Sequence, residues 1–456
     1  MANPLELKIT RYINGDSITD TLNGSAVTLK HTYNPKPGDG ETDISETVQL
    51  VLEGAQATVQ STVNTINRYL ADARARNLNG YGDRVYIEAR AGTAAGWRRS
   101  EITDGRISVT DDGMQAGLTS NARTNANLTI TRRGWWENTA GTYLPIYNSN
   151  GTADASGEYV NVYNCNDGSG SSPNKRENWV KAASANIIGD LPAPIKTTVY
   201  SVTVTALNKV YAARTISHYP NLSADDYFFD QSGTSDAGCS GGAYLSTSIS
   251  TDAETTVGTA TIVKTVEEPY LVSKYGNAPF HVIARFKDNT SLANVRFRLK
   301  VQINSTTMWT GPQFMLSTSE IIQDMGVVNI PPGPAFEWNT LTLLLTATRI
   351  TSATETIKLD YLALFGSELT VLQNIYTEPT GIYRFGGETN IATFAMLTPG
   401  EYSAPIIKYG ANSLMVVPGR DNFYNFATQS SAAGTAAITH NCKINMSYRP
   451  RWSSPL

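Results

Sequence analysis

The feature that most constrains the fold is a recurrence of short runs in which apolar and polar residues alternate. Alternation places successive side chains on opposite faces of an extended chain, as in a strand with one buried face. Turn formers separate these runs, with 36 Gly and 20 Pro among 456 residues, whereas charged residues make up only 17% of the chain. The pattern predicts a mainly β protein built from short strands and turns.

The runs extend along most of the chain. The expected strands are residues 5–13, 26–33, 47–52, 84–90, 98–102, 106–110, 127–132, 159–163, 195–207, 260–266, 280–286, 295–303, 338–347, 356–365, 411–417 and 437–448. Short strands at such intervals, bounded by turn residues, favour a β-sandwich for the part after residue 190.

One segment has a different period. Apolar residues recur at Val59, Val63, Ile66, Leu70 and Ala73, the spacing of one helix face. The period predicts a helix of about five or six turns. We expect this helix to pack on the neighbouring sheet, since a coiled-coil seam would require more heptads. The first region is therefore expected to be α+β.

The length of 456 residues exceeds one ordinary core and predicts two to four domains. A stretch dense in Gly, Ser, Asn and Asp between about residues 148 and 178 marks a boundary. The expected regions are 1–147, a first α+β domain; 148–190, a linker or extension; 191–368, a sandwich; and 369–456, a C-terminal β region completing a sandwich. Two successive sandwiches after residue 190, or one inserted into another, both fit these lengths.

The charge and hydropathy of the chain exclude several classes. The formal net charge is −4 and no basic face is evident, which argues against a large electrostatic footprint for nucleic acid or anionic membrane. The first residues lack a charged segment followed by an apolar stretch, and no long apolar run occurs anywhere. We expect neither a signal peptide nor a membrane span.

Patterns for catalysis are missing from the sequence. The four His residues stand at positions 31, 218, 281 and 440, without the spacing of a zinc enzyme, and no phosphate-binding glycine loop is present. Cys165, Cys239 and Cys442 lie far apart, which favours isolated reduced thiols. We expect no enzymatic activity, no catalytic residue, no cofactor and no metal.

Four tryptophans are the candidate contact residues. Trp309 and Trp338 lie in or beside the expected sandwich, where exposed rings stack on sugars or anchor partners. Trp135 and Trp136 follow a basic pair at the end of the first region. For all four, packing in a core is the competing interpretation.

Three parts of the chain, the first region, the middle and the end, together resemble the distal tail and minor tail proteins of long-tailed bacteriophages and prophages. In the first region the resemblance rests on INRYL at 66–70, RRSEI at 98–102 and LTITRRGWWE at 128–137. GDLPAP at 189–194, with the strands at 280–286 and 295–303 and LDYL at 359–362, is similar to a jelly-roll module of the carbohydrate-binding kind. PG at 418–419 and YRPRW at 448–452 resemble the termini of the same tail proteins. The chain departs from the compact members of this family by its long middle part.

The resemblance implies a structural protein of the virion at the tail tip or baseplate, assembled in the cytoplasm of a bacterial host. A tail-tube-like first domain, a split barrel or sandwich with one packed helix, would form a ring, with a hexamer as the expected state. Each copy would present one surface to a different surface of its neighbour. The ring would join the tail tube protein to the receptor-binding proteins, with the jelly roll outside and DNA only as passing cargo.

An alternative of another class remains open. A carbohydrate-binding adhesin of a virion or cell surface would use Trp309 and Trp338 to recognise a host-surface glycan. A glycan hydrolase is a third interpretation, for which no acid/base pair of carboxylates can be nominated from the sequence.

Overall fold

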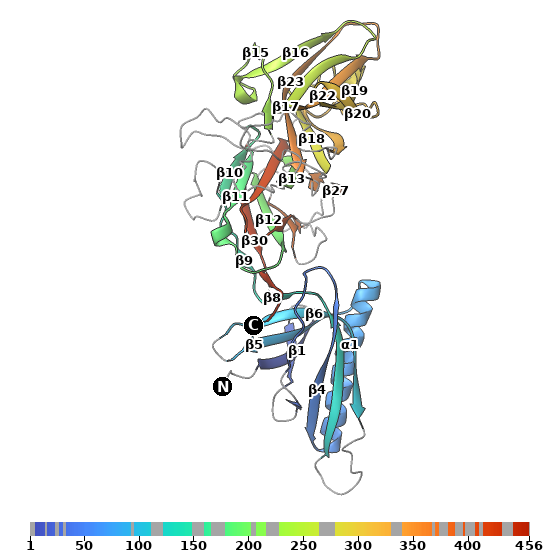
Figure 1. Cartoon of the computed structure of the whole chain (residues 1–456), viewed down its shortest axis with the longest axis vertical. Coiled ribbons are helices and arrows are strands. Elements are labelled where there is room, and N and C mark those ends of the chain that lie inside the picture. The colour runs from blue at the N-terminus through green and yellow to red at the C-terminus, as the bar shows by residue number, and fades with distance from the viewer. Residues whose placement is uncertain are drawn as a thin grey trace. The chain divides into compact units, whose positions relative to one another are not determined.

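The fold is known from a computed structural model (Figure 1). The structure describes residues 5–13, 16–22, 27–30, 33–92, 95–110, 122–147, 159–165, 178–201, 207–215, 228–263, 279–329, 340–366, 370–373, 382–387, 395–396, 406–409, 414–430 and 441–455. The chain divides into two compact units, and neither is continuous in sequence. Unit 1 comprises Met1–Thr142, Ile188–Ala193 and Arg449–Leu456, and unit 2 comprises Tyr143–Ile187 and Pro194–Tyr448. The expectation of a mainly β, multi-domain protein is confirmed.

Unit 1 contains one antiparallel sheet. Its strands are β1 (Leu5–Ile13), β2 (Asp16–Thr21), β3 (Val27–Leu29), β4 (Ile44–Gly54), β5 (Arg84–Ala91), β6 (Arg98–Thr110) and β7 (Ala122–Arg132), in the order β2-β1-β5-β6-β7-β4-β3. The two strands expected at 98–102 and 106–110 are the single strand β6. Its register with β7 shifts between Ile102 and Asp104. Such a bulge bends a strand, and here β6 pairs with β5 on one side of the bulge and with β7 along the rest.

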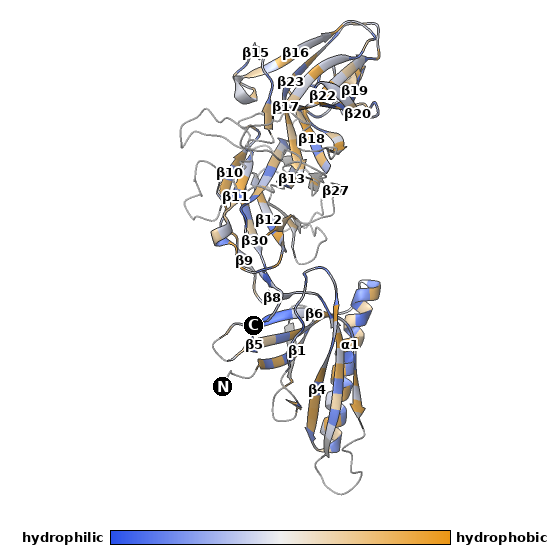
Figure 2. Cartoon of the chain, in the orientation of Figure 1, coloured by the Kyte–Doolittle hydropathy of each residue, from blue (hydrophilic) through white to orange (hydrophobic). Residues whose placement is uncertain are grey.

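The single α-helix among the described residues, α1 (Gln56–Asn79), covers this sheet and runs beside β4 and β6 in Figure 1. All five apolar positions that predicted the helix are buried, and Tyr69 is buried with them. Hydrophilic and hydrophobic residues alternate along the helix in Figure 2, as expected for an element with one buried face. Gly80 ends the helix in the left-handed conformation, and its N–H bonds to the Arg76 carbonyl.

Segments far apart in sequence close unit 1. Strand β31 (Arg451–Trp452) pairs with β8 (Trp136–Asn138), which in turn pairs with β6. The backbone N–H groups of Asp190 and Leu191 both bond to the Arg451 carbonyl. The four ranges expected from the sequence did not anticipate this arrangement, because pairing between residues some three hundred positions apart leaves no local signature.

Unit 2 begins with two sheets. The seven-stranded sheet has the order β10-β30-β12-β25-β26, with β28 on β12 and β9 on β30, and the five-stranded sheet has the order β11-β29-β13-β24-β27. Their strands are β9 (Thr142–Tyr143), β10 (Val160–Tyr163), β11 (Trp179–Ala182), β12 (Ala193–Ser201), β13 (Leu207–Thr215), β24 (Thr370–Gln373), β25 (Ile382–Gly386), β26 (Ala395–Met396), β27 (Ile406–Tyr409), β28 (Met415–Val416), β29 (Asn422–Ser430) and β30 (Asn441–Tyr448). Within the range expected as a linker, β10 and β11 are thus strands of these sheets, and each pairs with a strand near the end of the chain, β10 with β30 and β11 with β29.

The segment between β13 and β24 forms a jelly roll. Its strands are β14 (Phe228–Asp230), β15 (Thr234–Ser235), β16 (Ala243–Ile249), β17 (Thr255–Val263), β18 (Pro279–Phe286), β19 (Val295–Ile303), β20 (Thr306–Thr310), β21 (Ile322–Asn329), β22 (Thr340–Arg349) and β23 (Glu355–Gly366). One sheet has the order β15-β16-β23-β18-β21, with β14 on β23, and the other the order β17-β22-β19-β20. The pairs β16·β23, β17·β22, β18·β21 and β19·β20 nest inside one another like a folded hairpin, which is the jelly-roll connectivity.

The two sheets of the jelly roll share one apolar core, to which Phe280, Phe297, Leu343 and Leu359 contribute. The opposite face of the sheet containing β18 and β23 packs on β13 through a second cluster. The seven-stranded and the five-stranded sheet each contain strands that precede the jelly roll and strands that follow it. The jelly roll is therefore inserted into the domain that these two sheets form.

Short 3-10 helices lie at Ser184–Asn186, Ser240–Gly242 and Leu292–Asn294. Cys165, Cys239 and Cys442 are all buried, and none of them forms a disulfide. Within the ranges that the structure describes, no helix combines the length and apolar character needed to cross a membrane.

Candidate functional site

The first pair of candidate tryptophans lies in unit 1. Trp136 is fully buried, and the guanidinium of Arg132 lies 4.7 Å from the centre of its ring. Trp135 is half-buried, with the guanidinium of Arg451 at 3.9 Å from its ring. Both rings therefore take part in closing unit 1, and Trp136 lies in its core.

Arg132, the first residue of the basic pair that precedes these tryptophans, is the centre of a buried polar network. The Arg132 side chain has no exposed surface and bonds through Nε to the carboxylate of Glu46. Its Nη2 donates to the Lys36 carbonyl at 2.8 Å. Glu46 also accepts a hydrogen bond from the hydroxyl of Tyr33, and burial together with the negative charge of Glu46 raises the pKa of that phenol. The network joins β4, β7 and the segment between β3 and β4.

The second pair of candidate tryptophans is Trp309 and Trp338. Trp338 falls outside the described residues. Trp309 lies in β20, at the end of the sheet order β17-β22-β19-β20, and is 37% exposed. Of the four candidate tryptophans, Trp309 is the one that the structure describes as exposed.

Strand β20 is an unusual edge. A two-residue turn joins it to β19, and both turn residues, Asn304 (φ 47°) and Ser305 (φ 68°), have the positive φ of a tight hairpin. All five residues of β20 are exposed, and none is charged. Trp309 lies opposite the core residue Val301, so its ring lies on the inner face of the sheet.

The facing sheet ends at the same flank with β21. The register of β21 with β18 shifts where Met325 and Gly326 lie opposite Val282, and Gly326 has a positive φ of 97°. This bulge leaves Met325 buried in the jelly-roll core and Val327 exposed. Bulges commonly re-aim side chains beside binding sites.

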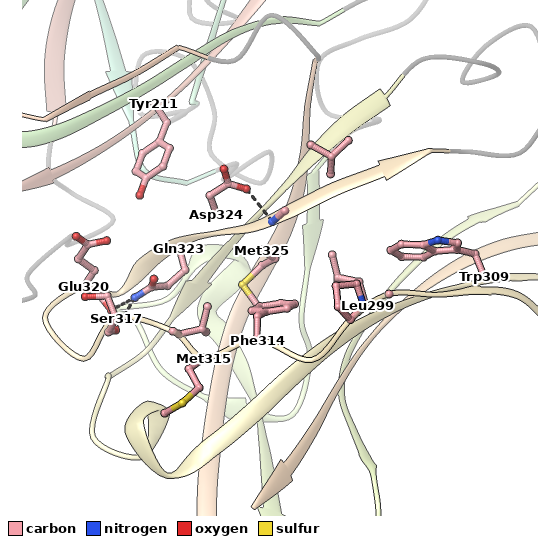
Figure 3. Close-up of a pocket in the computed structure, with 15 residues that line it drawn as sticks. Tyr211, Leu299, Trp309, Phe314, Met315, Ser317, Glu320, Gln323, Asp324 and Met325 are labelled. Atoms are coloured by element: carbon pink, nitrogen blue, oxygen red, sulfur yellow. Dashed lines mark hydrogen bonds between the residues drawn. The ribbon is translucent and has the colours of Figure 1, made fainter. Parts of the chain in front are cut away.

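Between these two edges lies a cavity of about 450 Å³, which we call the flank groove. Leu299, Phe314 and Met325 lie together in it, with Trp309 at one end and Glu320 at the other (Figure 3). Leu299 and Met325 belong to the jelly-roll core, so the groove is an opening into that core. Its lining residues are Tyr211, Leu299, Trp309, Gly311, Pro312, Phe314, Met315, Leu316, Ser317, Glu320, Gln323, Asp324, Met325, Gly326 and Val327. A volume of this size is within the usual range of ligand sites, about 300–1,000 Å³.

Exposed apolar side chains concentrate at this flank. Among the described residues eight large apolar side chains are exposed, and four of them, Met308, Trp309, Met315 and Val327, lie on β20, on β21 or in the segment between these strands. Clustered apolar exposure marks interaction sites, whereas scattered single residues are ordinary.

The polar groups of the groove are already occupied. Gln323 donates to the carbonyls of Ser317 and Glu320, both at 2.7 Å. Glu320 pairs with Lys209. Asp324 accepts the N–H of Gly326 at 2.9 Å and lies 3.2 Å from Nδ1 of His281. The free binding capacity of the groove is therefore mainly apolar.

Two observations concern described residues outside the groove. No group of three or more His, Cys, Asp or Glu residues that could hold a metal is present within the described ranges. Burial and the nearby Asp360 carboxylate raise the pKa of the Cys239 thiol to about 11, which keeps it protonated and unreactive at neutral pH.

Sequence reasoning found Trp309 but missed the rest of the groove. Phe314 and Met315 lie in the segment between β20 and β21, whereas Met325 lies in β21. They meet Trp309 only when the two sheets face each other. A local signal did exist, since the two bulky apolar residues Met308 and Trp309 stand in a short polar strand directly after a tight turn.

No protein-family model matches the chain, and no curated protein matches it. Among solved structures, a chain of the phage p2 baseplate in its activated conformation is 8% identical, with a TM-score of 0.31 over 98% of this chain and 97% of that one. A chain of T=1 particles derived from infectious bursal virus is also 8% identical, with a TM-score of 0.17 over 99% of this chain and 79% of that one. At such low TM-scores these similarities carry no argument about fold or function.

Proposed function

We propose that the protein is a structural component of a bacteriophage tail, a ring-forming protein of the tail tip or baseplate. It joins the tail tube to the receptor-binding proteins, encloses part of the DNA channel, and acts by assembly rather than by catalysis. The proposal rests on the sequence resemblance of the first region to distal and minor tail proteins.

One observation carries this proposal. The segment LTITRRGWWE at 128–137, one of the stretches that carry the resemblance, contributes buried residues to the core of unit 1. Arg132 and Trp136 have no exposed surface, and Arg132 bonds to Glu46 in β4. The residues that carry the resemblance therefore lie in the core of the unit, where they stabilise its fold, and not in a surface loop.

The exposed side of α1 suits a contact between copies. Gln60, Ser61 and Asn64 are exposed and uncharged, and with Ala57, Thr65 and Arg68 they line a hollow of about 530 Å³. Charged residues are depleted at the centres of protein interfaces, because burying them removes their hydration. Contact of this face with a different face of the next copy would generate a closed ring.

Native mass spectrometry of the full chain tests the ring directly. We expect a closed oligomer, with a hexamer as the main species. Asn64→Arg places a cation at the centre of the α1 hollow and should dissociate the ring, whereas Asn77→Arg, the same change on an exposed residue near the end of the helix, should not. A monomer at high protein concentration, or equal behaviour of the two variants, would count against the proposal.

A glycan-binding adhesin is the second candidate function, favoured by the partly exposed indole of Trp309 in a groove that the carboxylate of Asp324 also lines. Aromatic faces with adjacent polar groups bind sugars. Titration of the full chain with host-surface oligosaccharides, followed by tryptophan fluorescence, should then give saturable binding that Trp309→Ala abolishes. Saturable binding by a monomer would favour this candidate over the ring.

A further inference from the structure

We propose that the flank groove and the free edge of β20 together form a docking site for an extended segment of a partner protein. The segment adds a strand to β20 and inserts apolar side chains between the two sheets of the jelly roll. This inference does not depend on the ring, because it concerns residues of unit 2 alone.

The backbone of β20 provides the first half of the site. Gly311 donates its N–H to the Leu299 carbonyl at 2.9 Å, and Thr310 lies opposite Lys300, one position along. Because hydrogen-bonded and non-bonded pairs alternate in an antiparallel ladder, the N–H and C=O of Thr310 point away from β19. No described residue bonds to them. These groups match the backbone of an incoming extended chain.

The edge also lacks the charged residues and prolines that commonly prevent strand addition. Edge strands are commonly protected by Lys, Pro or an inward-pointing charge. The sequence of β20, Thr306–Thr310, contains only Thr, Met and Trp. A bulge at Met308 interrupts the pairing with β19 but leaves the part of β20 nearest the groove regular.

The groove provides the second half. An apolar side chain entering between the sheets would contact Leu299, Phe314 and Met325, and Trp309 would form the wall next to the added strand. Leu299 and Met325 already belong to the core, so the entering side chain would extend an existing apolar cluster. Burial of this kind is the main source of affinity in such contacts.

The charges of the lining define the partner further. Glu320 and Asp324 are acidic, and none of the lining residues is basic. Lys209 compensates Glu320, whereas Asp324 faces only a histidine ring and a backbone N–H. The partner segment is therefore expected to lack Asp and Glu and to carry Lys or Arg near Asp324.

A sugar fits this site less well than a polypeptide. Carbohydrate recognition requires free donors and acceptors, but Gln323 and Glu320 already have partners inside the protein. Breaking those bonds would leave buried polar groups unsatisfied. The unused groups are a strand edge and apolar surface, and an extended peptide offers the complement of both.

Selection from a random library of linear peptides of about twelve residues tests the proposal, since bound segments of this kind are short strands. The full chain is the bait, and Val327→Arg is used for counter-selection. Val327 lies on the groove and is 44% exposed. Ile350→Arg is the matched control, because Ile350 is 43% exposed in the same jelly roll but does not line the groove.

We expect enriched peptides with alternating apolar residues and no acidic ones, whose affinity Val327→Arg lowers about tenfold or more, since it places a charge against apolar surface. Ile350→Arg should leave the affinity unchanged. N-methylation of alternate peptide bonds, or Thr310→Pro, should weaken binding by removing the backbone pairing. Failure to enrich any sequence, equal binding to both arginine variants, or binding unaffected by N-methylation would each overturn the proposal.

Discussion

The buried ion pair of unit 1 makes the sharpest stability prediction. Arg132→Met removes a guanidinium with no exposed surface, which bonds to Glu46 and to the carbonyls of Lys36 and Arg133, at 2.8 and 3.0 Å. The Glu46 side chain is only 4% exposed. Its carboxylate would then be buried without a compensating charge.

The magnitude follows from that geometry. Removing one partner of a buried pair costs about 3–5 kcal/mol, because the remaining charge is desolvated and unpaired. Glu46→Leu should cost a similar amount. In the double variant no charge remains, and the main loss is the bonds of three polar groups, roughly 1 kcal/mol each. These groups are the Tyr33 hydroxyl and the Lys36 N–H, which bond to Glu46, and the Lys36 carbonyl, which accepts from Arg132. The two single changes should therefore be coupled by several kcal/mol.

Hydrogen exchange followed by mass spectrometry measures the change in the free energy of unfolding of this region. The amides to follow are those of β4 and β7, which pair along their full length. Arg106→Met is the matched control, since Arg106 is exposed on β6 and should change stability by less than about 0.5 kcal/mol. Additive effects of the two single variants would refute the reasoning, because independent residues show no coupling.

Three further predictions concern stability. Leu70→Ala, which empties part of the interface between α1 and the sheet, should cost about 2–5 kcal/mol in denaturant unfolding, whereas the exposed Asn64→Ala should cost little. Ser305→Gly should raise the melting temperature of the jelly roll, because glycine adopts the positive φ of this turn without the cost of roughly 1 kcal/mol borne by other residues. The hydrogen bond from Lys287 lowers the pKa of Asp236 in the folded state. A depressed pKa contributes stability above the unfolded value that is lost as pH falls through the folded value, so Asp236→Asn should destabilise the protein at neutral pH and not in strong acid.

Local periodicity predicted individual elements well. The expected strands 5–13 and 295–303 coincide with β1 and β19, and the five positions that predicted α1 are all buried. Each of these elements has a one-sided burial pattern that depends only on neighbours a few residues away. Strand β6 was split in two because its bulge interrupts the alternation locally, although the strand itself continues.

The candidate site was predictable only in part. Trp309 was named because it lies in or beside the expected sandwich, where exposed aromatic rings stack on sugars or anchor partners. Its partners Phe314 and Met325 are unremarkable in sequence, and the register that exposes Val327 depends on the bulge at Gly326. Trp136 was left open between core and contact, and only the packing around Arg132 decided that it lies in the core.

The sequence by itself determined a mainly β protein, the position of the helix at Gln56–Asn79 and about half of the described strands, since these follow from residue periodicity. Only the tertiary structure decided that Arg449–Leu456 complete unit 1, that the jelly roll is inserted between β13 and β24, and that two sheet edges meet at one apolar groove. Antiparallel pairing between distant segments depends on backbone groups common to all residues, so the sequence carries no mark of which strands will meet.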